Sequence, residues 1–274
     1  MSKVLFQHES EVVGPLIREA GRIVMAHYRT EFTVTTKSDS SPVTMADLDA
    51  NSLIVERLTA AFPEDTIISE ESPTTGKKNS ERKWLIDPLD GTREFVDKNG
   101  MFVIMIGLAI KGEAVFGAIY QPTEDLFMMG AKNFLSIQQG GKNLTPNLSP
   151  TTLGKDSIFV ISRSHPSKSV ERITKKVESK GVVRIGSVGL KIAQIVTGQG
   201  DVYLSTSNKM SEWDTCAPEA ILRAAGGTVS DITGAPLRYG KESPNTKRGI
   251  IASNGLLHHL VVDACREIVE KKKW

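Results

Sequence analysis

The spacing of apolar residues predicts two helices at the start of the chain. Apolar side chains recur every three or four positions over residues 8–28 and again over residues 43–61, the spacing of a helix with one buried face. A short apolar run at 66–69 then predicts a strand that ends at Glu70. The stretch 73–82 is polar and basic, and it predicts a mobile loop.

The remainder of the chain shows two different patterns. Apolar runs predict antiparallel strands at 102–110, 114–120, 126–129 and 134–137. Residues 139–155 are rich in Gly, Asn, Thr, Ser and Pro, which indicates a boundary between lobes. Beyond it, strands at 158–161, 182–185, 202–205 and 249–252 alternate with helices at 168–179, 188–196, 215–225 and 256–270. We therefore expect an N-terminal α+β lobe, residues 1–145, and a C-terminal α/β lobe, residues 146–274.

The stretch W-L-I-D-P-L-D-G-T, residues 84–92, has the clearest chemical character. Its apolar residues predict a buried strand that ends at Asp87, because Pro88 has no N–H and favours an extended residue before it. Gly91 allows a sharp turn, and Thr92 is a good N-cap for a following helix. Two carboxylates beside free backbone N–H groups suit Mg²⁺ and phosphate. Taken alone, such Asp-Pro and Asp-Gly pairs are equally typical of structural turns.

Further acidic residues occur at the ends of other predicted elements. Glu70 ends a strand, Asp214 directly precedes a helix and Asp47 lies in the first turns of another helix. Each has an ordinary explanation as a cap, a turn or a solvated residue. Together with Asp87 and Asp90, however, they are better explained by one acidic pocket than by five coincidences.

Composition excludes several classes of protein. The 274 residues carry a net charge of +2 and are 39% hydrophobic, without the concentrated basic charge of a nucleic-acid-binding protein. Two cysteines, Cys216 and Cys265, are too few for a disulfide scaffold and indicate free thiols in a reducing compartment. The N-terminus lacks a signal-peptide core, and the longest apolar run, 102–110, is too short to cross a membrane. We expect a soluble, cytoplasmic protein with no integral membrane segment.

Four motifs in this order resemble those of a known enzyme family. They are K-S-D-S-S-P-V-T-M-A-D at 37–47, S-E-E at 69–71, D-P-L-D-G-T at 87–92 and W-D at 213–214. The set is similar to the Mg²⁺-dependent, Li⁺-sensitive phosphomonoesterases related to inositol monophosphatase. This resemblance covers nearly the whole chain. It implies a fold of α+β and α/β character, a layered αβαβα sandwich of the inositol monophosphatase and fructose-1,6-bisphosphatase type.

Within this superfamily the chain most resembles the 3′(2′),5′-bisphosphate nucleotidases. The features that carry this resemblance are S-S-P-V-T at 40–44, G-T-R-E-F at 91–95, I-S-R-S-H at 161–165, G-S at 186–187 with Lys191, and W-D-T-C-A-P-E at 213–219. Inositol monophosphatases more typically read G-T-x-N-F after the aspartates. The resemblance implies hydrolysis of the 3′-phosphate of 3′-phosphoadenosine 5′-phosphate to AMP and phosphate, in sulfur assimilation. The partner molecule is then a small phosphorylated nucleotide.

The resemblance also implies a metal centre. Glu70, Asp87 and the carbonyl group of Leu89 would bind a first Mg²⁺, and Asp87, Asp90 and Asp214 would bind a second. Two or three ions per site are implied, with Mn²⁺ as a substitute and Li⁺ as an inhibitor. The physics agrees, because four packed carboxylates repel one another and raise one another's pKa values unless cations offset their charge.

Catalytic and substrate-binding roles follow from the same resemblance. Asp47 and Thr92 would orient and deprotonate the attacking water. Substrate contacts would come from Glu70, Leu89, Asp90, Gly91, Thr92, Ser164, His165, Ser187, Lys191 and Asp214. Lys191 suits the distal 5′-phosphate as a compact positive charge, whereas His165 is equally well explained as an ordinary loop histidine. Because the substrate is strongly negative, we expect positive charge near the site.

Other functions fit the same motifs. An inositol monophosphatase or a broader sugar-phosphate phosphatase would share the hydrolytic centre but would not bind a 5′-phosphate. A metal- or nucleotide-binding regulator without catalysis is disfavoured by the complete acidic set. The sequence leaves open the choice between the bisphosphate and its sulfated analogue, 3′-phosphoadenosine 5′-phosphosulfate, and the oligomeric state. It also leaves open the role of the basic loop 75–82 and a peripheral contact of the basic tail 271–273 with the inner membrane.

Overall fold

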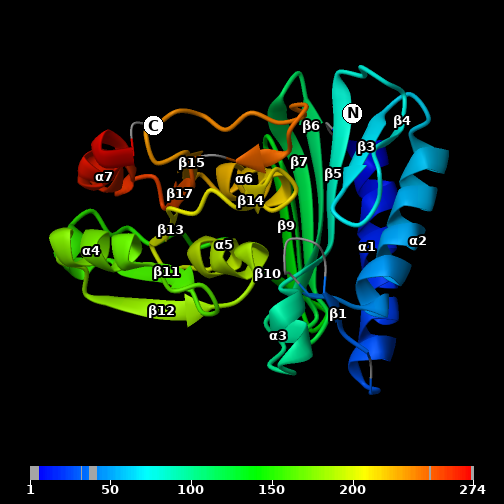
Figure 1. Ribbon diagram of the computed structural model, residues 1–274, viewed down its shortest axis with the longest axis horizontal. Coiled ribbons are helices and arrows are strands. Elements are labelled where there is room, and N and C mark those ends of the chain that lie inside the picture. The colour runs from blue at the N-terminus through cyan, green and yellow to red at the C-terminus, as the bar shows by residue number, and fades with distance from the viewer. Residues whose placement is uncertain (1–5, 32, 37–41, 247, 273–274) are drawn as a thin grey trace.

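The protein consists of alternating layers of helices and sheets (Figure 1). The computed structural model describes residues 6–31, 33–36, 42–246 and 248–272. The motif residues 37–41 and the tail residue Lys273 lie outside this described part. The helices are α1 (Gln7–Tyr28), α2 (Met45–Ala61), α3 (Thr92–Val96), α4 (Lys168–Lys176), α5 (Val188–Val196), α6 (Cys216–Ala224) and α7 (His258–Lys272), with a 3₁₀ turn η1 (Gly154–Asp156).

An eight-stranded sheet with two long helices on one face forms the first half of the molecule. Its strands, in spatial order, are β10 (Lys142–Leu144), β9 (Phe134–Gln139), β8 (Leu126–Ala131), β7 (Glu113–Gln121), β6 (Val103–Ile110), β5 (Arg82–Asp90), β3 (Thr66–Ser69) and β4 (Thr75–Gly76). Helices α1 and α2 cover one face, where Ile17, Ile54 and Trp84 are fully buried in a shared core. The helical spacing of apolar residues therefore predicted both helices and their buried faces.

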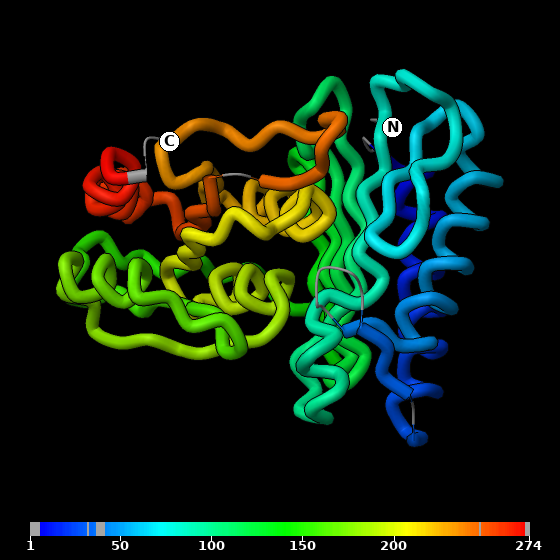
Figure 2. Tube along the Cα trace, in the orientation of Figure 1, coloured from blue at the N-terminus to red at the C-terminus, as the bar shows by residue number. Residues whose placement is uncertain are grey.

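A five-stranded sheet forms the second half. Its order is β12 (Gly181–Ile185), β11 (Ile158–Ser162), β13 (Val202–Ser205), β17 (Ile250–Ser253) and β15 (Thr228–Ser230). Helices α5 and α6 lie between the two sheets, and α4 and α7 cover the outer face (Figure 1). Met105 of the large sheet, Ile192 of α5 and Ile221 of α6 are buried in one core. Figure 2 shows the two halves of the chain side by side, with the blue-to-green first half on the right.

The predicted αβαβα sandwich is confirmed by this layer order. Two short ribbons add to it: β1 (Thr35–Thr36) pairs with β2 (Pro42–Val43), and β14 (Met210–Ser211) pairs with β16 (Asn245–Thr246). No helix within the described residues combines the length and the apolar character needed to cross a bilayer.

The strand of the 84–92 motif is longer than predicted. Instead of ending at Asp87, β5 continues to Asp90, which pairs with Val103 of β6. The register shifts between Asp87 and Asp90, so the irregularity accommodates Pro88 without a ladder hydrogen bond. The predicted N-cap was also wrong: Gly91, with φ of 99°, is the N-cap of α3, and Thr92 is its first helical residue.

The four strands predicted to be antiparallel, β6 to β9, are antiparallel, but the first sheet also contains one parallel pair. Strand β3 runs parallel to β5, because the chain returns through the edge strand β4 before β5 begins. The predicted loop 73–82 therefore contains a strand. In the second sheet, β17 is antiparallel to both of its neighbours, and β15 has no counterpart in the prediction. Short strands such as β15, three residues long, carry too little periodicity to be recognised in a sequence.

Candidate active site

Three carboxylates from distant parts of the chain converge beside the large sheet. Glu70, Asp87 and Asp214 each place an oxygen within 4.8 Å of the others. Glu70 and Asp87 meet because β3 and β5 are adjacent and parallel, and the Glu70 N–H donates to the Ile86 carbonyl at 3.1 Å. Carboxylate groups that follow parallel strands lie at the same edge of a sheet, which brings these two residues together.

Asp214 reaches the same point from the second half of the chain. It directly precedes α6, and its Oδ2 accepts a hydrogen bond from the Ser211 N–H at 2.7 Å. Helix α6 packs closely on the large sheet: a Cβ atom at Gly117 would lie 2.4 Å from the Ala217 carbonyl oxygen. A Cβ atom at Gly107 would lie 2.7 Å from the Ala217 nitrogen. The two glycines therefore permit the close approach that brings Asp214 to the other carboxylates.

Without a bound cation, the negative charges of these carboxylate groups are unfavourable. Burial, with the neighbouring charge of Glu70 as the next cause, raises the pKa of Asp87 well above its usual range. The pKa of Asp214 is raised in the same way, by burial first and then by Glu70 and Asp90. The Leu89 N–H donates to Asp87 Oδ1 at 3.0 Å and offsets part of this effect. Closely packed carboxylate groups make one another harder to ionise, and a bound divalent cation removes this penalty. Carboxylate oxygens are also the ligands that Mg²⁺ prefers, so these residues fit a Mg²⁺-type site.

Asp90 lies beside this trio and is held by the second half of the chain. Its Oδ2 accepts hydrogen bonds from Ser187 Oγ at 2.6 Å and from the Gly189 N–H at 3.0 Å. Ser187 is the N-cap of α5, and the same hydroxyl accepts from the Leu190 N–H at 3.2 Å. The start of α5 thus orients Asp90. A negative charge is stabilised at this position because a helix N-terminus carries a partial positive charge.

The structure also brings together the two residues expected to act on water. Thr92 Oγ1 donates to Asp47 Oδ1 at 3.1 Å, although the two residues are 45 positions apart. Asp47 Oδ2 accepts from the Thr44 N–H at 2.8 Å and from Thr44 Oγ1 at 2.7 Å at the start of α2. The capping role and the expected catalytic role are therefore compatible, because they use different oxygens of one carboxylate. The Leu89 carbonyl oxygen also lies 3.3 Å from Thr92 Oγ1 and is the more distant of the two acceptors for its single proton.

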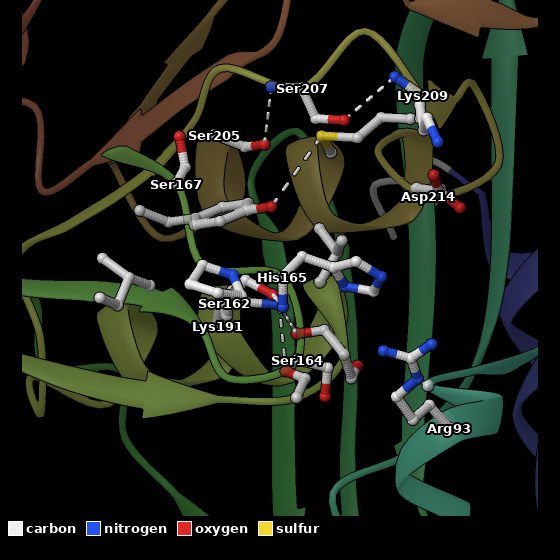
Figure 3. A pocket seen from close by; sticks show the side chains of 18 of the residues that line it. Arg93, Ser162, Ser164, His165, Ser167, Lys191, Ser205, Ser207, Lys209 and Asp214 are labelled. Carbon is white, nitrogen blue, oxygen red and sulfur yellow. Dashed lines mark hydrogen bonds between the residues drawn. The ribbon is translucent and has the colours of Figure 1, made fainter. Parts of the chain in front are cut away.

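A pocket of about 720 Å³ opens next to the carboxylates and is lined by both halves of the chain. The predicted site residues that line it are Glu70, Asp90, Gly91, Thr92, Ser164, His165, Ser187, Lys191 and Asp214. The hydroxyls of Ser162, Ser167 and Ser205 add polar groups to its wall (Figure 3). All the predicted substrate contacts except Leu89 thus face one cavity, which is large enough for a nucleotide-sized molecule.

Positive side chains line this pocket, as expected for a site that binds a negatively charged molecule. Lys191 is 3% exposed, and its Nζ donates to the carbonyl groups of Gly186 at 3.2 Å and Ser187 at 2.8 Å. An ammonium group has three donors, so one remains for a ligand. Burial lowers the pKa of Lys191 to about 8, even though nearby carboxylates, chiefly Asp90, favour its charge.

Three further cations, Arg93, Arg184 and Lys209, line the pocket and were missed by the sequence reasoning. Arg93 on α3 and Lys209 before β14 lie on either side of His165 (Figure 3). Within the described residues neither forms an ion pair. Burial, followed by the charges of Arg93 and Lys191, lowers the pKa of His165, so its ring is neutral near pH 7. Arg93 could have been found from its place directly after Thr92, whereas nothing in the sequence marks Lys209.

Sequence comparison decides the family. The profile of the inositol monophosphatase family matches residues 8–270. The chain belongs to the inositol monophosphatase family. Metal dependence is typical of this family, in agreement with the acidic cluster. The chain is also similar to solved family members. An inositol monophosphatase from Anabaena superimposes with a TM-score of 0.78 at 27% identity over 96% of both chains. The Thermotoga maritima IMPase superimposes with a TM-score of 0.79 at 25% identity over 96% of this chain and 98% of that one.

Curated relatives within the family carry a more specific name. The 3′(2′),5′-bisphosphate nucleotidase CysQ of Shigella flexneri is 32% identical over 231 residues, covering 83% of this chain and 92% of the relative. The protein of the same name from Buchnera aphidicola is 34% identical over 233 residues, covering 83% of this chain and 86% of the relative. The resemblance to these nucleotidases predicted from the motifs is therefore confirmed.

Proposed function

We propose that this protein is a metal-dependent 3′(2′),5′-bisphosphate nucleotidase that converts 3′-phosphoadenosine 5′-phosphate to AMP and phosphate. The observation that carries the proposal is the convergence of Glu70, Asp87 and Asp214 beside a pocket with basic side chains. The similarity to curated nucleotidases at 32% and 34% identity supports the nucleotide as substrate. Such a pocket suits a nucleoside that carries two phosphate groups on its ribose.

The metal ions of this proposal are Mg²⁺, with Mn²⁺ as a substitute and Li⁺ as an inhibitor. Glu70, Asp87 and the Leu89 carbonyl group would hold one ion, and Asp87, Asp90 and Asp214 another. When bound, such ions offset the carboxylate charge, polarise the phosphoryl group and make water more acidic. The raised pKa values of both Asp87 and Asp214 support this assignment, because bound cations would favour their ionised forms.

The protein's own groups position and deprotonate the attacking water. Thr92 Oγ1 donates its proton to Asp47 Oδ1, so its lone pairs face outward and accept a hydrogen bond from the water. As the water oxygen bonds to phosphorus, its proton passes to Thr92 Oγ1 and the hydroxyl proton passes to Asp47 Oδ1. The bond between phosphorus and the 3′-oxygen of the ribose breaks, and the departing oxygen takes a proton from solvent water to become the 3′-hydroxyl of AMP. The backbone N–H groups of Gly91 and Thr92 lie at the pocket wall and would donate to the phosphate oxygens.

The remaining part of the nucleotide would bind to the second half of the chain. Ser164, His165, Ser187 and Lys191 would contact it as predicted, and Arg93 and Lys209 add charge for the 5′-phosphate. This arrangement supports a division of the chain into two lobes. Residues 1–145 would provide most metal ligands, and residues 146–274 would provide the nucleotide contacts. We further propose a cytoplasmic role in sulfur assimilation.

A substrate panel at controlled Mg²⁺ tests the proposal. Phosphate release from 3′-phosphoadenosine 5′-phosphate should exceed release from inositol 1-phosphate, require Mg²⁺ and decrease as Li⁺ is titrated in. A preference for inositol 1-phosphate would instead identify an inositol or sugar-phosphate phosphatase. Failure to release phosphate from any monoester with Mg²⁺ would indicate a regulator without catalysis.

A further inference from the structure

A buried carboxylate outside the metal cluster, Glu94, connects the two halves of the pocket. It lies on α3, is 2% exposed, and has no role in the proposed chemistry. Its Oε1 accepts from Ser164 Oγ, and its Oε2 forms an ion pair with Arg163. The Asn99 side chain donates to the same Oε2 at 2.5 Å. Both carboxylate oxygens therefore have donors, and two of these donors come from the second half of the chain.

Glu94 also packs directly on the turn before α5. A Cβ atom at Gly186 would lie 2.4 Å from Glu94 Cγ, so the Glu94 side chain packs directly on the backbone of Gly186. The next residue, Ser187, holds Asp90 at 2.6 Å. One side chain thus contacts both the β11–α4 loop and the turn that orients Asp90.

Residues 162–167, the last residue of β11 and its connection to α4, form the 162–167 loop, which is the part of the pocket wall that this contact holds. Five of its residues line the pocket, as does Glu94, and Arg163 pairs with Glu94 without lining the pocket itself. The five are Ser162, Ser164, His165, Pro166 and Ser167. The loop is also held at its two ends. The Arg163 N–H donates to the Ile185 carbonyl group at 3.1 Å, the Ser167 hydroxyl lies 3.2 Å from that of Thr206, and the Ser167 carbonyl group accepts from the Glu171 N–H at 3.0 Å.

The Glu94 contact differs from the surface pairs of the molecule. Burial alone would raise its pKa, but the bonds from Ser164 and Asn99 and the charge of Arg163 outweigh burial and lower it. Arg163 also reaches Asp97 at 3.3 Å, but the Asp97 side chain is 46% exposed, where such a pair contributes little. The buried carboxylate is the partner that holds the loop.

We propose that Glu94 is a positioning residue that holds the 162–167 loop over the pocket and thereby sets the preference for a nucleotide over smaller phosphomonoesters. This inference rests on the proposed function. Without Glu94, Ser164 and His165 lose their fixed place, and the contacts to the nucleoside weaken. An Asn side chain keeps a Cγ atom beside Gly186, so Ser187 and Gly189 keep their hydrogen bonds to Asp90. The Asp47–Thr92 pair also keeps its hydrogen bond, and the metal cluster is therefore unaffected.

Glu94→Asn and Arg163→Ala test this in the full chain, with Glu113→Gln as the matched control. Asn is too short to reach the loop, and Arg163, with a side chain 39% exposed, can be removed without a buried cavity. Glu113 forms a similar pair with Arg238 at 2.6 Å, but neither residue lines the pocket. The measurements are hydrogen exchange of the amides in 162–167, steady-state kinetics with 3′-phosphoadenosine 5′-phosphate and p-nitrophenyl phosphate, and the Mg²⁺ concentration for half-activation.

In both variants we expect faster exchange in 162–167 and a KM for the nucleotide raised about tenfold, with kcat changed less than about threefold. The KM for p-nitrophenyl phosphate and the Mg²⁺ half-activation should stay at the wild-type values, as should all values in the control. The double variant should add little to the larger single effect, because both residues act through one contact.

The inference is overturned if exchange and nucleotide KM are unchanged, or if both substrates and the Mg²⁺ requirement are affected equally. A wild-type protein that hydrolyses p-nitrophenyl phosphate but no bisphosphate nucleotide would refute the proposed function instead. The exchange measurement then still decides whether Glu94 holds the loop.

Discussion

A folded core normally excludes carboxylate side chains such as those of Asp87, Asp90 and Asp214. A buried carboxylate without a counter-charge is costly, and here several lie together. Asp90 differs from the others because hydrogen bonds from Ser187 and the Gly189 N–H compensate part of that cost. Its side chain is therefore already oriented, which makes it a suitable position for a test of function separate from folding.

At the scale of single residues we predict that Asp90→Asn inactivates the protein without unfolding it. The amide keeps the size of the side chain but removes one negative charge from the proposed metal site. We expect kcat to fall about 10²- to 10³-fold, comparable to the loss of one electrostatic group in an active site. Phosphate release measures the loss, and circular dichroism shows that the fold persists. Near-normal turnover would contradict the metal assignment.

At the scale of elements, the position of the site depends on how closely α6 approaches the large sheet. Gly107 and Gly117 pair across β6 and β7 and leave room for the start of α6. Local sequence patterns predict helix α6 and strands β6 and β7. The distance between the helix and the strands, however, is small because Gly107 and Gly117 have no side chains. Asp214 reaches Glu70 and Asp87 only because this separation is small.

We predict that Gly117→Ala weakens both the fold and the metal site. The added methyl group would contact the backbone of Ala217, so α6 must move outward and take Asp214 with it. Overpacking of this kind lowers the free energy of unfolding by about 1–3 kcal/mol. Thermal unfolding and the Mg²⁺ half-activation measure the two effects. Gly181→Ala is the control, because a Cβ atom there has no neighbour within 4 Å, and equal behaviour of both variants would refute the prediction.

Helix α7 is joined to the second sheet by a buried histidine that responds to pH. His258 contacts Ser230 of β15 at 2.8 Å and Ser253 of β17 at 3.0 Å, and burial lowers its pKa from 6.5 to about 4. Between these values the unfolded chain binds a proton that the folded protein does not. The contribution of His258 to stability is therefore complete above about pH 6.5 and is lost as the pH falls toward 4.

His258→Gln should reduce this acid sensitivity. The glutamine does not titrate, so the decrease in melting temperature between pH 7 and pH 4 should be smaller than in the wild type. The exposed neighbour provides the control: His259→Gln should keep a slope close to that of the wild type. An unchanged slope in His258→Gln would show that this histidine is not the sensor.

At the scale of the whole molecule, the proposed metal site joins the two halves of the chain. Glu70 and Asp87 belong to the large sheet, whereas Asp214 leads into α6 between the sheets. In the proposed assignment Asp87 is shared by both ions and Asp214 binds one of them, so the bound ions would stabilise only the arrangement in which both halves are docked. Metal binding should therefore stabilise the entire fold, since a ligand that binds only the native state raises its stability.

We predict that Mg²⁺ raises the melting temperature of protein treated with EDTA. At about one hundred times the dissociation constant the gain is about 2.7 kcal/mol, which corresponds to a rise of about 5–10 °C for a chain of this size. Differential scanning calorimetry measures it, with Asp90→Asn as a comparison that should gain less. The absence of any shift would show that the carboxylates do not form a metal site.

The local pattern of the chain predicted much of this protein. The long helices α1, α2 and α5, most strands of both sheets and the acidic residues of the site were recognisable, because periodicity and turn residues act over a few positions. The longer β5, the parallel β3–β5 pair and the small strands were not, because pairing with a neighbour decides them. Arg93, Lys209 and Glu94 were missed for the same reason: their roles depend on partners far along the chain.

The sequence by itself determined which residues are available for chemistry and roughly where each helix and strand lies, because these depend on side-chain type and short-range geometry. Only the tertiary structure decided that Glu70, Asp87 and Asp214 meet, and that Asp47 reaches Thr92 across 45 positions. Burial raises the pKa of a carboxylate only once the chain has folded around it. The free-energy penalty of burying these carboxylates therefore arises only from tertiary packing, and this penalty is the reason that a bound cation would stabilise the site.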